Sequence, residues 1–191
     1  MNALTVNFKS VLELTDEQFF HLCQANRDLR FERTATGELI IMPPTGGETG
    51  NRNGRLTQKL FNWADADGTG IAFDSSTGFK LPNGANRSPD ASWVKLESWN
   101  VLTQKQQTRF LPLCPDFVVE LLSPTDILRD TQEKMREYRD NGANLGWLIN
   151  RKSRQVEIYR IGKDVEVLES PVSLSGEDVL PGFVLNVEAI W

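Results

Sequence analysis

The strongest constraint on the fold is a strand–helix–strand pattern between residues 116 and 150. The apolar run 117–122 is typical of a strand that is covered on both faces. The segment 126–141 is predicted to be a helix, because its apolar side chains recur at helical spacing and an Asn-Gly pair ends it. A second strand follows at 146–150. Two strands joined by so long a connection can run parallel, which predicts an α/β protein.

The rest of the sequence predicts a mixed sheet with helices on both faces. Thr15 and Gln18 form a capping-box pattern that starts a short helix. The length of 191 residues fits one domain, and we interpret residues 1–191 as a single α/β domain with an N-terminal helix and hairpin. The other predicted elements are a helix over 16–26, a hairpin over 29–42, a helix over 48–65, and strands within 71–76, 78–81, 90–94 and 155–160.

Composition limits the available chemistry. The chain has one histidine, His21, and two cysteines, Cys23 and Cys114. These numbers exclude a disulfide scaffold, a four-thiolate metal site and a zinc site built on several histidines. Carboxylates, lysines and a hard metal ion remain as candidate catalytic groups. The net charge of −5 disfavours a generally basic nucleic-acid binder but leaves a local basic groove open.

The hydropathy of the sequence indicates the cellular compartment. The first residues lack the apolar core of a signal peptide, and no run of about 18 apolar residues occurs in the sequence. We therefore expect no membrane span and a cytoplasmic protein with reduced thiols.

Two carboxylates occupy unusual places in the predicted strands. Side-chain alternation along 116–122 puts Glu120 in the middle of an otherwise apolar face, where it needs a cationic partner, a proton or a metal ion. Asp90 follows Pro89 and opens the strand 90–94 at the rim of the sheet. Taken singly, a structural salt bridge explains Glu120 equally well, and a turn explains Asp90.

Together these residues resemble a known motif. Pro89-Asp90, followed roughly 30 residues later by Glu120, is similar to the motif of the PD-(D/E)XK nuclease superfamily, which has the restriction-endonuclease-like fold. The resemblance is closest to its "putative restriction endonuclease" branch and covers roughly residues 10–191. It implies an endonuclease that hydrolyses DNA with Mg²⁺ or Mn²⁺, with Asp90 and Glu120 as metal ligands and catalytic residues. The segments that carry it are 115–160, the hairpin with its Pro-Pro end, the PTGGE segment and the tail LPGFVLNVEAIW.

The sequence departs from the superfamily pattern at the catalytic lysine. That lysine normally stands two residues after the glutamate, where this chain has Leu122. Its relocation to the next helix is similar to a change found in other members, which makes Lys134 the candidate. The alternative for Lys134 is an exposed side chain that pairs within its own helix. Glu48 matches the glutamate that the superfamily often supplies from its first core helix, although a glutamate in a first turn also favours the helix dipole.

Candidate DNA contacts lie on the helix 48–65, where Arg52, Arg55 and Lys59 share one face. A solvated charged face is the ordinary alternative. Two other functions stay open: a catalytically inactive domain of the same fold that binds nucleic acid or protein, and a metal-dependent phosphoesterase with a small substrate. Many nucleases of this fold form dimers, so the resemblance is also compatible with a homodimer.

Overall fold

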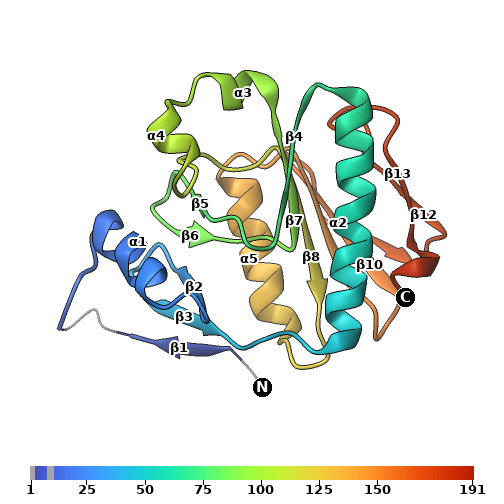
Figure 1. Cartoon of the computed structure of the whole chain (residues 1–191). Helices are drawn as coiled ribbons and strands as arrows, with labels where there is room; N and C mark the ends of the chain where they lie inside the picture. Colours follow the sequence, from blue (N-terminus) through green and yellow to red (C-terminus); the bar gives the residue numbers. More distant parts are fainter. Residues whose placement is uncertain (1–2, 8–10) are drawn as a thin grey trace.

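A six-stranded mixed sheet forms the centre of the computed structural model, which describes residues 3–7 and 11–191 (Figure 1). The strand order is β11-β10-β9-β8-β7-β4. The central strand β8 pairs parallel with β9 and antiparallel with β7, and the helix α5 connects the two parallel strands. The predicted strand–helix–strand unit is therefore confirmed. The elements are β4 (Gly70–Asp74), β7 (Ala91–Lys95), β8 (Phe117–Leu122), α5 (Leu128–Asp140), β9 (Leu145–Asn150), β10 (Gln155–Arg160) and β11 (Glu166–Glu169).

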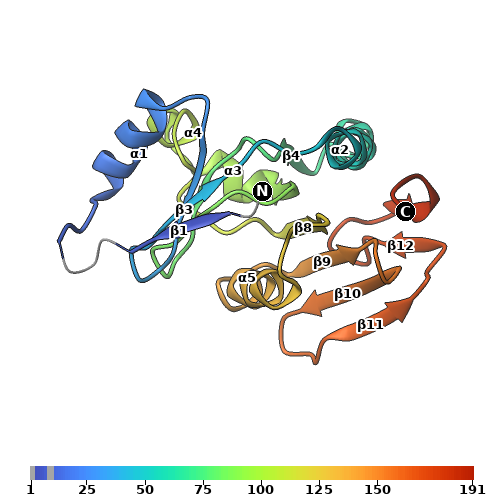
Figure 2. The same ribbon diagram turned by 90° about the horizontal axis from the view of Figure 1, so that it is seen from below.

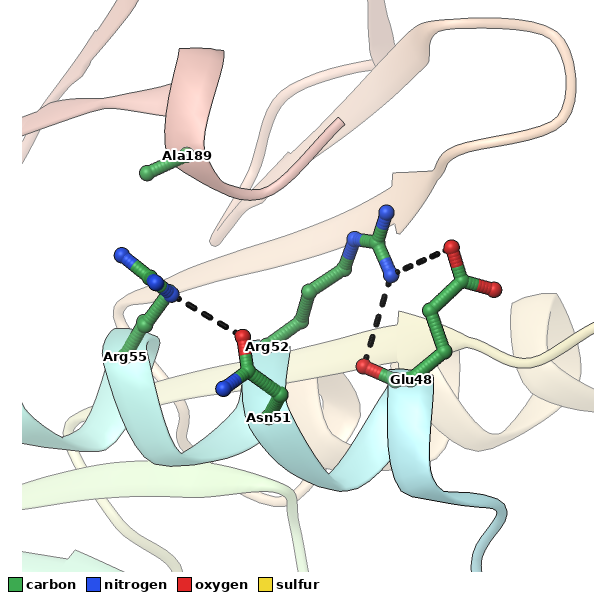
Figure 3. A pocket seen from close by; sticks show the side chains of 5 residues that line it. All are labelled: Glu48, Asn51, Arg52, Arg55 and Ala189. Carbon is green, nitrogen blue, oxygen red and sulfur yellow. Dashed lines mark hydrogen bonds and ion pairs between the residues drawn. The ribbon is translucent and has the colours of Figure 1, made fainter.

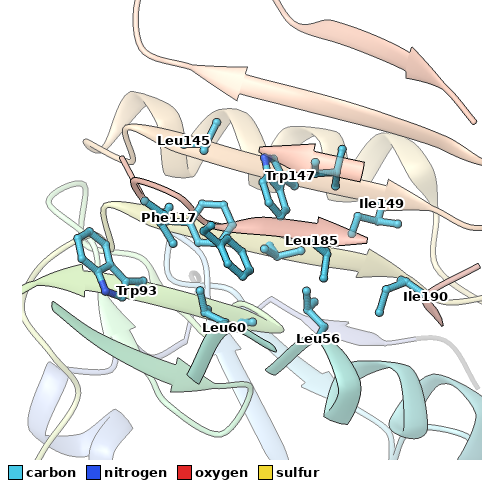
Figure 4. Packing of buried hydrophobic residues seen from close by; sticks show 14 of the residues in the cluster. Leu56, Leu60, Trp93, Phe117, Leu145, Trp147, Ile149, Leu185 and Ile190 are labelled. Atoms are coloured by element: carbon cyan, nitrogen blue, oxygen red, sulfur yellow. The ribbon is translucent and has the colours of Figure 1, made fainter. Parts of the chain in front are cut away.

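The two faces of this sheet are covered by different helices, as Figure 2 shows from below. On one face, Leu60 of α2 (Gly47–Asp67) and Phe117 of β8 belong to one buried cluster (Figure 4). On the other face, Met135 of α5 and Val118 of β8 belong to a second cluster. Residues of β8 thus alternate between the two helices, and this alternation turns Glu120 toward α5.

The C-terminal segment closes the α2 face of the sheet. Leu185 and Ile190 are buried in the same cluster as the α2 leucines (Figure 4). The elements of this segment are β12 (Ser173–Ser175), β13 (Val184–Asn186) and the 3₁₀ helix η1 (Val187–Ala189), and the two strands form a separate antiparallel pair.

The N-terminal hairpin belongs to a second sheet, with the strand order β1-β3-β2-β6-β5. The strand predicted at 78–81 pairs with β6 and so joins the hairpin strands rather than the central mixed sheet. The two residues of β6 are too few to show any alternation in the sequence. The strands are β1 (Leu4–Val6), β2 (Arg30–Arg33), β3 (Leu39–Met42), β5 (Phe79–Lys80) and β6 (Asn86–Arg87).

The chain passes from the second sheet to the first through two residues, Ser88 and Pro89, which join β6 to Asp90 and β7. This short link fixes the hairpin sheet against the edge of the central sheet where Asp90 lies. Three short helices complete the described part of the chain: α1 (Asp16–Ala25), which starts at the predicted capping box of Thr15 and Gln18, α3 (Leu96–Asn100) and α4 (Gln104–Gln107). Within the described residues, no helix has the length and apolar character needed to cross a membrane.

Candidate active site

The side chain of Lys134 reaches from α5 to the carboxylate of Glu120. The distance from Lys134 Nζ to Glu120 Oε1 is 2.7 Å, and the distance to Glu32 Oε1 is 2.8 Å. The Tyr138 hydroxyl, one turn further along α5, donates a hydrogen bond of 3.1 Å to the same Glu120 oxygen. The Lys134 side chain is only 15% exposed, so its ammonium is directed into the protein rather than toward a partner on its own helix surface.

Asp90 lies beside Glu120 at the edge of the central sheet. It is one step beyond the Ala91–Val119 pair, and the same antiparallel register places it opposite Glu120. The Asp90 carboxylate accepts two hydrogen bonds: the backbone N–H of Leu121 donates to Oδ2 at 2.8 Å, and Asn53 Nδ2 donates to Oδ1 at 2.7 Å. The structure therefore brings together three residues that the sequence singled out: Asp90 immediately before β7, Glu120 on β8 and Lys134 on α5.

Two further residues of this cluster were missed by the sequence reasoning. Asn53 lies on the buried side of α2, and a signal for it existed, because the buried positions 49, 56 and 60 of that helix extend to 53 at helical spacing. Glu32 lies on β2 and is 3% exposed. No local pattern marks Glu32, because its contact with Lys134 depends on how the hairpin sheet sits against the central sheet.

Glu48 lies outside this cluster. It is exposed in the first turn of α2, and its carboxylate pairs with Arg52 at 2.7 Å (Figure 3). The same carboxylate also pairs with Arg151 at 3.2 Å. Among the described residues, it makes no hydrogen bond or ion pair with Asp90, Glu120 or Lys134. The helix position that does reach Asp90 is Asn53, roughly 7.5 Å further along the α2 axis at ~1.5 Å per residue.

Burial and charge strongly perturb the titration of these groups. Burial, assisted by the neighbouring Asp90 and Glu32 carboxylates, raises the pKa of Glu120 to about 8 despite the ammonium of Lys134. Burial also raises the pKa of Asp90. The Glu120 and Glu32 carboxylates overcome the effect of burial on Lys134 and raise its pKa, so the ammonium form is stabilised.

The pKa of Glu32 is perturbed in the opposite direction. Burial alone would raise this pKa, but Lys134 and Arg87 together hold it below its ordinary value. Glu32 is therefore the ionised partner of Lys134, whereas Glu120 and Asp90 are carboxyl groups whose charges lack full compensation.

A divalent cation would fit the donors of this cluster. Two carboxyl groups, Glu120 and Glu32, contact the Lys134 ammonium, and a third, Asp90, lies opposite Glu120. The charge of Arg87, which also contacts Glu32, is matched by Glu137. Glu120 Oε2 accepts no hydrogen bond from the described residues, and the amide oxygen of Asn53 is buried without a donor. These are hard oxygen donors. In the described part of the chain, no group of three or more His, Cys, Asp or Glu side chains forms a ready metal cage, so Asp90 and Glu120 would share the ion with waters.

Residues 16–188 match the family Uma2, described as "Putative restriction endonuclease". The chain belongs to this family. A search of the curated proteins finds no match. A crystal structure described as "a putative nuclease belonging to DUF820 from Anabaena variabilis ATCC 29413" is similar to this chain with a TM-score of 0.72 at 17% sequence identity, over 84% of this chain and 88% of that chain. At that identity, the likeness shows the fold alone.

Membership of the Uma2 family confirms the resemblance to the restriction-endonuclease-like branch of the PD-(D/E)XK superfamily. The structural likeness confirms the predicted fold class, a mixed sheet flanked by helices. The Uma2 match also supports nuclease function in general terms.

The raised pKa of Glu120 predicts a specific pH dependence of stability in the metal-free protein. Because the folded-state pKa of about 8 lies above the ordinary value of 4.5, the proton on Glu120 stabilises the folded state fully below about pH 4.5. This contribution is lost as the pH rises through 8. The free energy of unfolding, measured with urea from pH 5 to pH 9, should therefore fall more steeply for wild type than for Glu120→Gln.

The exposed Glu133, which pairs with Arg129 on the same helix, supplies the control. Glu133→Gln should follow the wild-type pH dependence. If the difference in unfolding free energy between wild type and Glu120→Gln is the same at pH 5 and pH 8, the pKa of Glu120 is not raised and the electrostatic description of the site is wrong.

Proposed function

We propose that this protein is a metal-dependent endonuclease that hydrolyses phosphodiester bonds in DNA, with Asp90, Glu120 and Lys134 as its active site. The observation that carries the proposal is the 2.7 Å contact between Lys134 and Glu120. Leu122 occupies the position from which the superfamily motif would present its lysine, and the ammonium from α5 reaches the same carboxylate instead. Family membership then supports nuclease chemistry at this cluster.

Asp90 and Glu120 would hold Mg²⁺ or Mn²⁺. The bound ion would lower the pKa of a coordinated water and neutralise charge on the scissile phosphate. The Leu121 amide and Asn53 fix the two oxygens of Asp90 in place, and Tyr138 and Lys134 do the same for one oxygen of Glu120. The ligands are thus held before any substrate arrives.

The surroundings of Lys134 favour a role as a hydrogen-bond donor over a role as a general base. Two carboxylates stabilise its charged form and raise its pKa, which disfavours proton abstraction by a neutral amine. An ammonium at this place would donate a hydrogen bond to the attacking water or to a phosphate oxygen. It would also offset the charge that develops on the phosphate in the transition state.

The proposed DNA-binding surface is the exposed side of α2. Arg55 and Lys59 are exposed, and neither contacts a carboxylate among the described residues. Arg52 is less available, because its guanidinium pairs with Glu48 and donates to the Trp191 carbonyl. Because Asn53 on the same helix contacts Asp90, a phosphate backbone that follows α2 would lead toward the active site. A hollow of about 490 Å³ lies beside these arginines. Figure 3 shows the residues that line it: Glu48, Asn51, Arg52, Arg55 and Ala189.

The displaced lysine gives the sharpest test of the catalytic proposal. Lys134→Met should lower Mg²⁺-dependent cleavage of plasmid DNA about a hundredfold or more, since it removes a charged hydrogen-bond donor from the transition state. Adding Leu122→Lys to this variant should restore part of the activity. Position 122 shares its strand face with Glu120 and lies about 6.6 Å from it along the strand.

The exposed Lys163 provides the matched control, and Lys163→Met should cleave like wild type. Thermal melts should accompany every assay, because breaking a buried ion pair costs about 3–5 kcal/mol. Full activity in folded Lys134→Met would remove the lysine from the mechanism. Wild-type protein that binds the ion but cleaves no DNA would instead favour the inactive binding domain.

The DNA-binding proposal predicts a local effect of charge. Arg55→Glu combined with Lys59→Glu should weaken DNA binding and reduce the slope of log affinity against log salt by about 2, because each side chain would neutralise one phosphate. The control combines Lys105→Glu with Lys163→Glu, two exposed lysines elsewhere, and changes the net charge by the same amount. Equal reductions of affinity in the two double variants, measured by fluorescence anisotropy, would show that net charge rather than the α2 surface governs binding.

A further inference from the structure

Glu32 is the one buried carboxylate in this region that the proposed chemistry does not use. It stands on β2 in the hairpin sheet, outside the central sheet that carries Asp90 and Glu120. Three donors hold its carboxylate: Lys134 Nζ at 2.8 Å, the Ser88 backbone N–H at 2.9 Å and Arg87 at 3.1 Å. Each donor lies on a segment adjoining the active site.

We propose that Glu32 is a positioning residue that holds the ammonium of Lys134 in its working orientation against Glu120. The inference rests on the proposed function, because it gives Glu32 a role only through Lys134. In this view, the hairpin sheet is a part of the catalytic unit.

The geometry supports this role. A lysine ammonium has three N–H donors on a flexible side chain, so one carboxylate contact leaves the group free to rotate. Here Glu120 and Glu32 take two donors from opposite sheets, and the third faces the Ser88 carbonyl at the long distance of 3.5 Å. Two short contacts fix the direction of this third N–H, and its long contact with Ser88 is the one that a water or a phosphate oxygen would replace.

Glu32 also holds the segment that carries Asp90, the proposed metal ligand. Its Oε1 accepts both the Lys134 ammonium and the Ser88 N–H, and Ser88 lies two residues before Asp90. The same oxygen thus joins α5 to the segment that leads into β7. A shift of one of these groups would displace the other.

A purely structural role for Glu32 would consist of binding Arg87, and the chain contains a matched control for it. Glu137 binds the same guanidinium at 2.5 Å, but among the described residues it forms no hydrogen bond or ion pair with Lys134. Glu32→Gln and Glu137→Gln each remove one carboxylate from Arg87, and only the first weakens the hold on Lys134. Differences between the two variants therefore report the contact with the lysine.

The kinetic test is a double-variant cycle on metal-dependent DNA cleavage. Glu32→Gln should lower kcat about tenfold or more with little change in KM, because misplacing a catalytic group affects the transition state rather than substrate binding. In the Lys134→Met background, Glu32→Gln should cause a much smaller fractional decrease of kcat, because only the contact of Glu32 with the Ser88 segment then remains to be altered. Glu137→Gln should leave kcat near wild type. An equal fractional decrease from Glu32→Gln in both backgrounds, or an effect confined to KM, would overturn the proposal.

A second readout does not depend on cleavage. In ¹⁵N-labelled protein, the Lys134 ammonium should give a resolved, slowly exchanging signal in wild type and in Glu137→Gln, and this signal should be absent from Glu32→Gln. Persistence of an unchanged signal in Glu32→Gln would overturn the proposal even if the protein proved not to be a nuclease. Conversely, full activity of a folded Lys134→Met variant would remove Lys134 from the proposed mechanism and leave this signal test of the contact intact. Should Glu32→Gln fail to fold, Glu32→Asp keeps the charge, shortens the side chain and should show the same decreases in kcat and in the signal.

Discussion

A buried ammonium held between two carboxylates organises the whole candidate site. Taking the Lys134 charge out of water is costly, and only short contacts with Glu120 and Glu32 make its position favourable. These contacts join α5, the central strand β8 and the hairpin strand β2. The two sheets and the crossover helix are therefore joined through one ammonium, that of Lys134. Asp90 comes under the same constraint, because the segment that carries it is bonded to Glu32.

The contact between Lys134 and Glu120 is both a buried ion pair and the centre of the proposed active site. The sequence leaves open whether Glu120 has a structural partner or a catalytic role. In the structure its ion-pair partner is Lys134, which is also the proposed catalytic lysine. What distinguishes the site from a simple buried pair is the excess of negative charge around that lysine. A core salt bridge would gain nothing from placing Asp90 opposite Glu120, whereas a cation site needs both. Burial is the main cause of the raised pKa of Glu120, and the Asp90 and Glu32 carboxylates raise it further, which reflects that excess.

The sequence allowed much of this site to be predicted because the relevant signals are local. Alternation along 117–122 predicts that Glu120 lies on an otherwise apolar face, and the superfamily resemblance makes Lys134, beside the apolar stripe of the next helix, the candidate lysine. The parallel pairing of β8 with β9 followed from the length of the connection. The predicted metal-ligand and catalytic roles of these residues remain predictions, because proximity alone does not establish a reaction.

The remaining features depend on long-range contacts that no local pattern displays. The hairpin sheet includes β6, whose two residues are too short to show alternation, and Glu32 reaches the site only through that sheet. Glu48 matches by position the glutamate that the superfamily supplies from its first core helix, but its carboxylate pairs with Arg52 (Figure 3) and with Arg151. Asn53 could have been found from the buried stripe of α2, had polar residues been considered there along with the leucines.

The central claim is that Asp90 and Glu120 bind one divalent cation. Crystals of the wild-type protein grown or soaked with Mn²⁺ should show a single anomalous peak, with an oxygen of each carboxylate close to the ~2.1 Å expected for hard cations of this size. Crystals of Glu120→Gln treated in the same way should lack the peak. An empty site in wild-type crystals, with the Lys134–Glu120 contact unchanged at saturating Mn²⁺, would contradict the account and identify the contact as a structural ion pair.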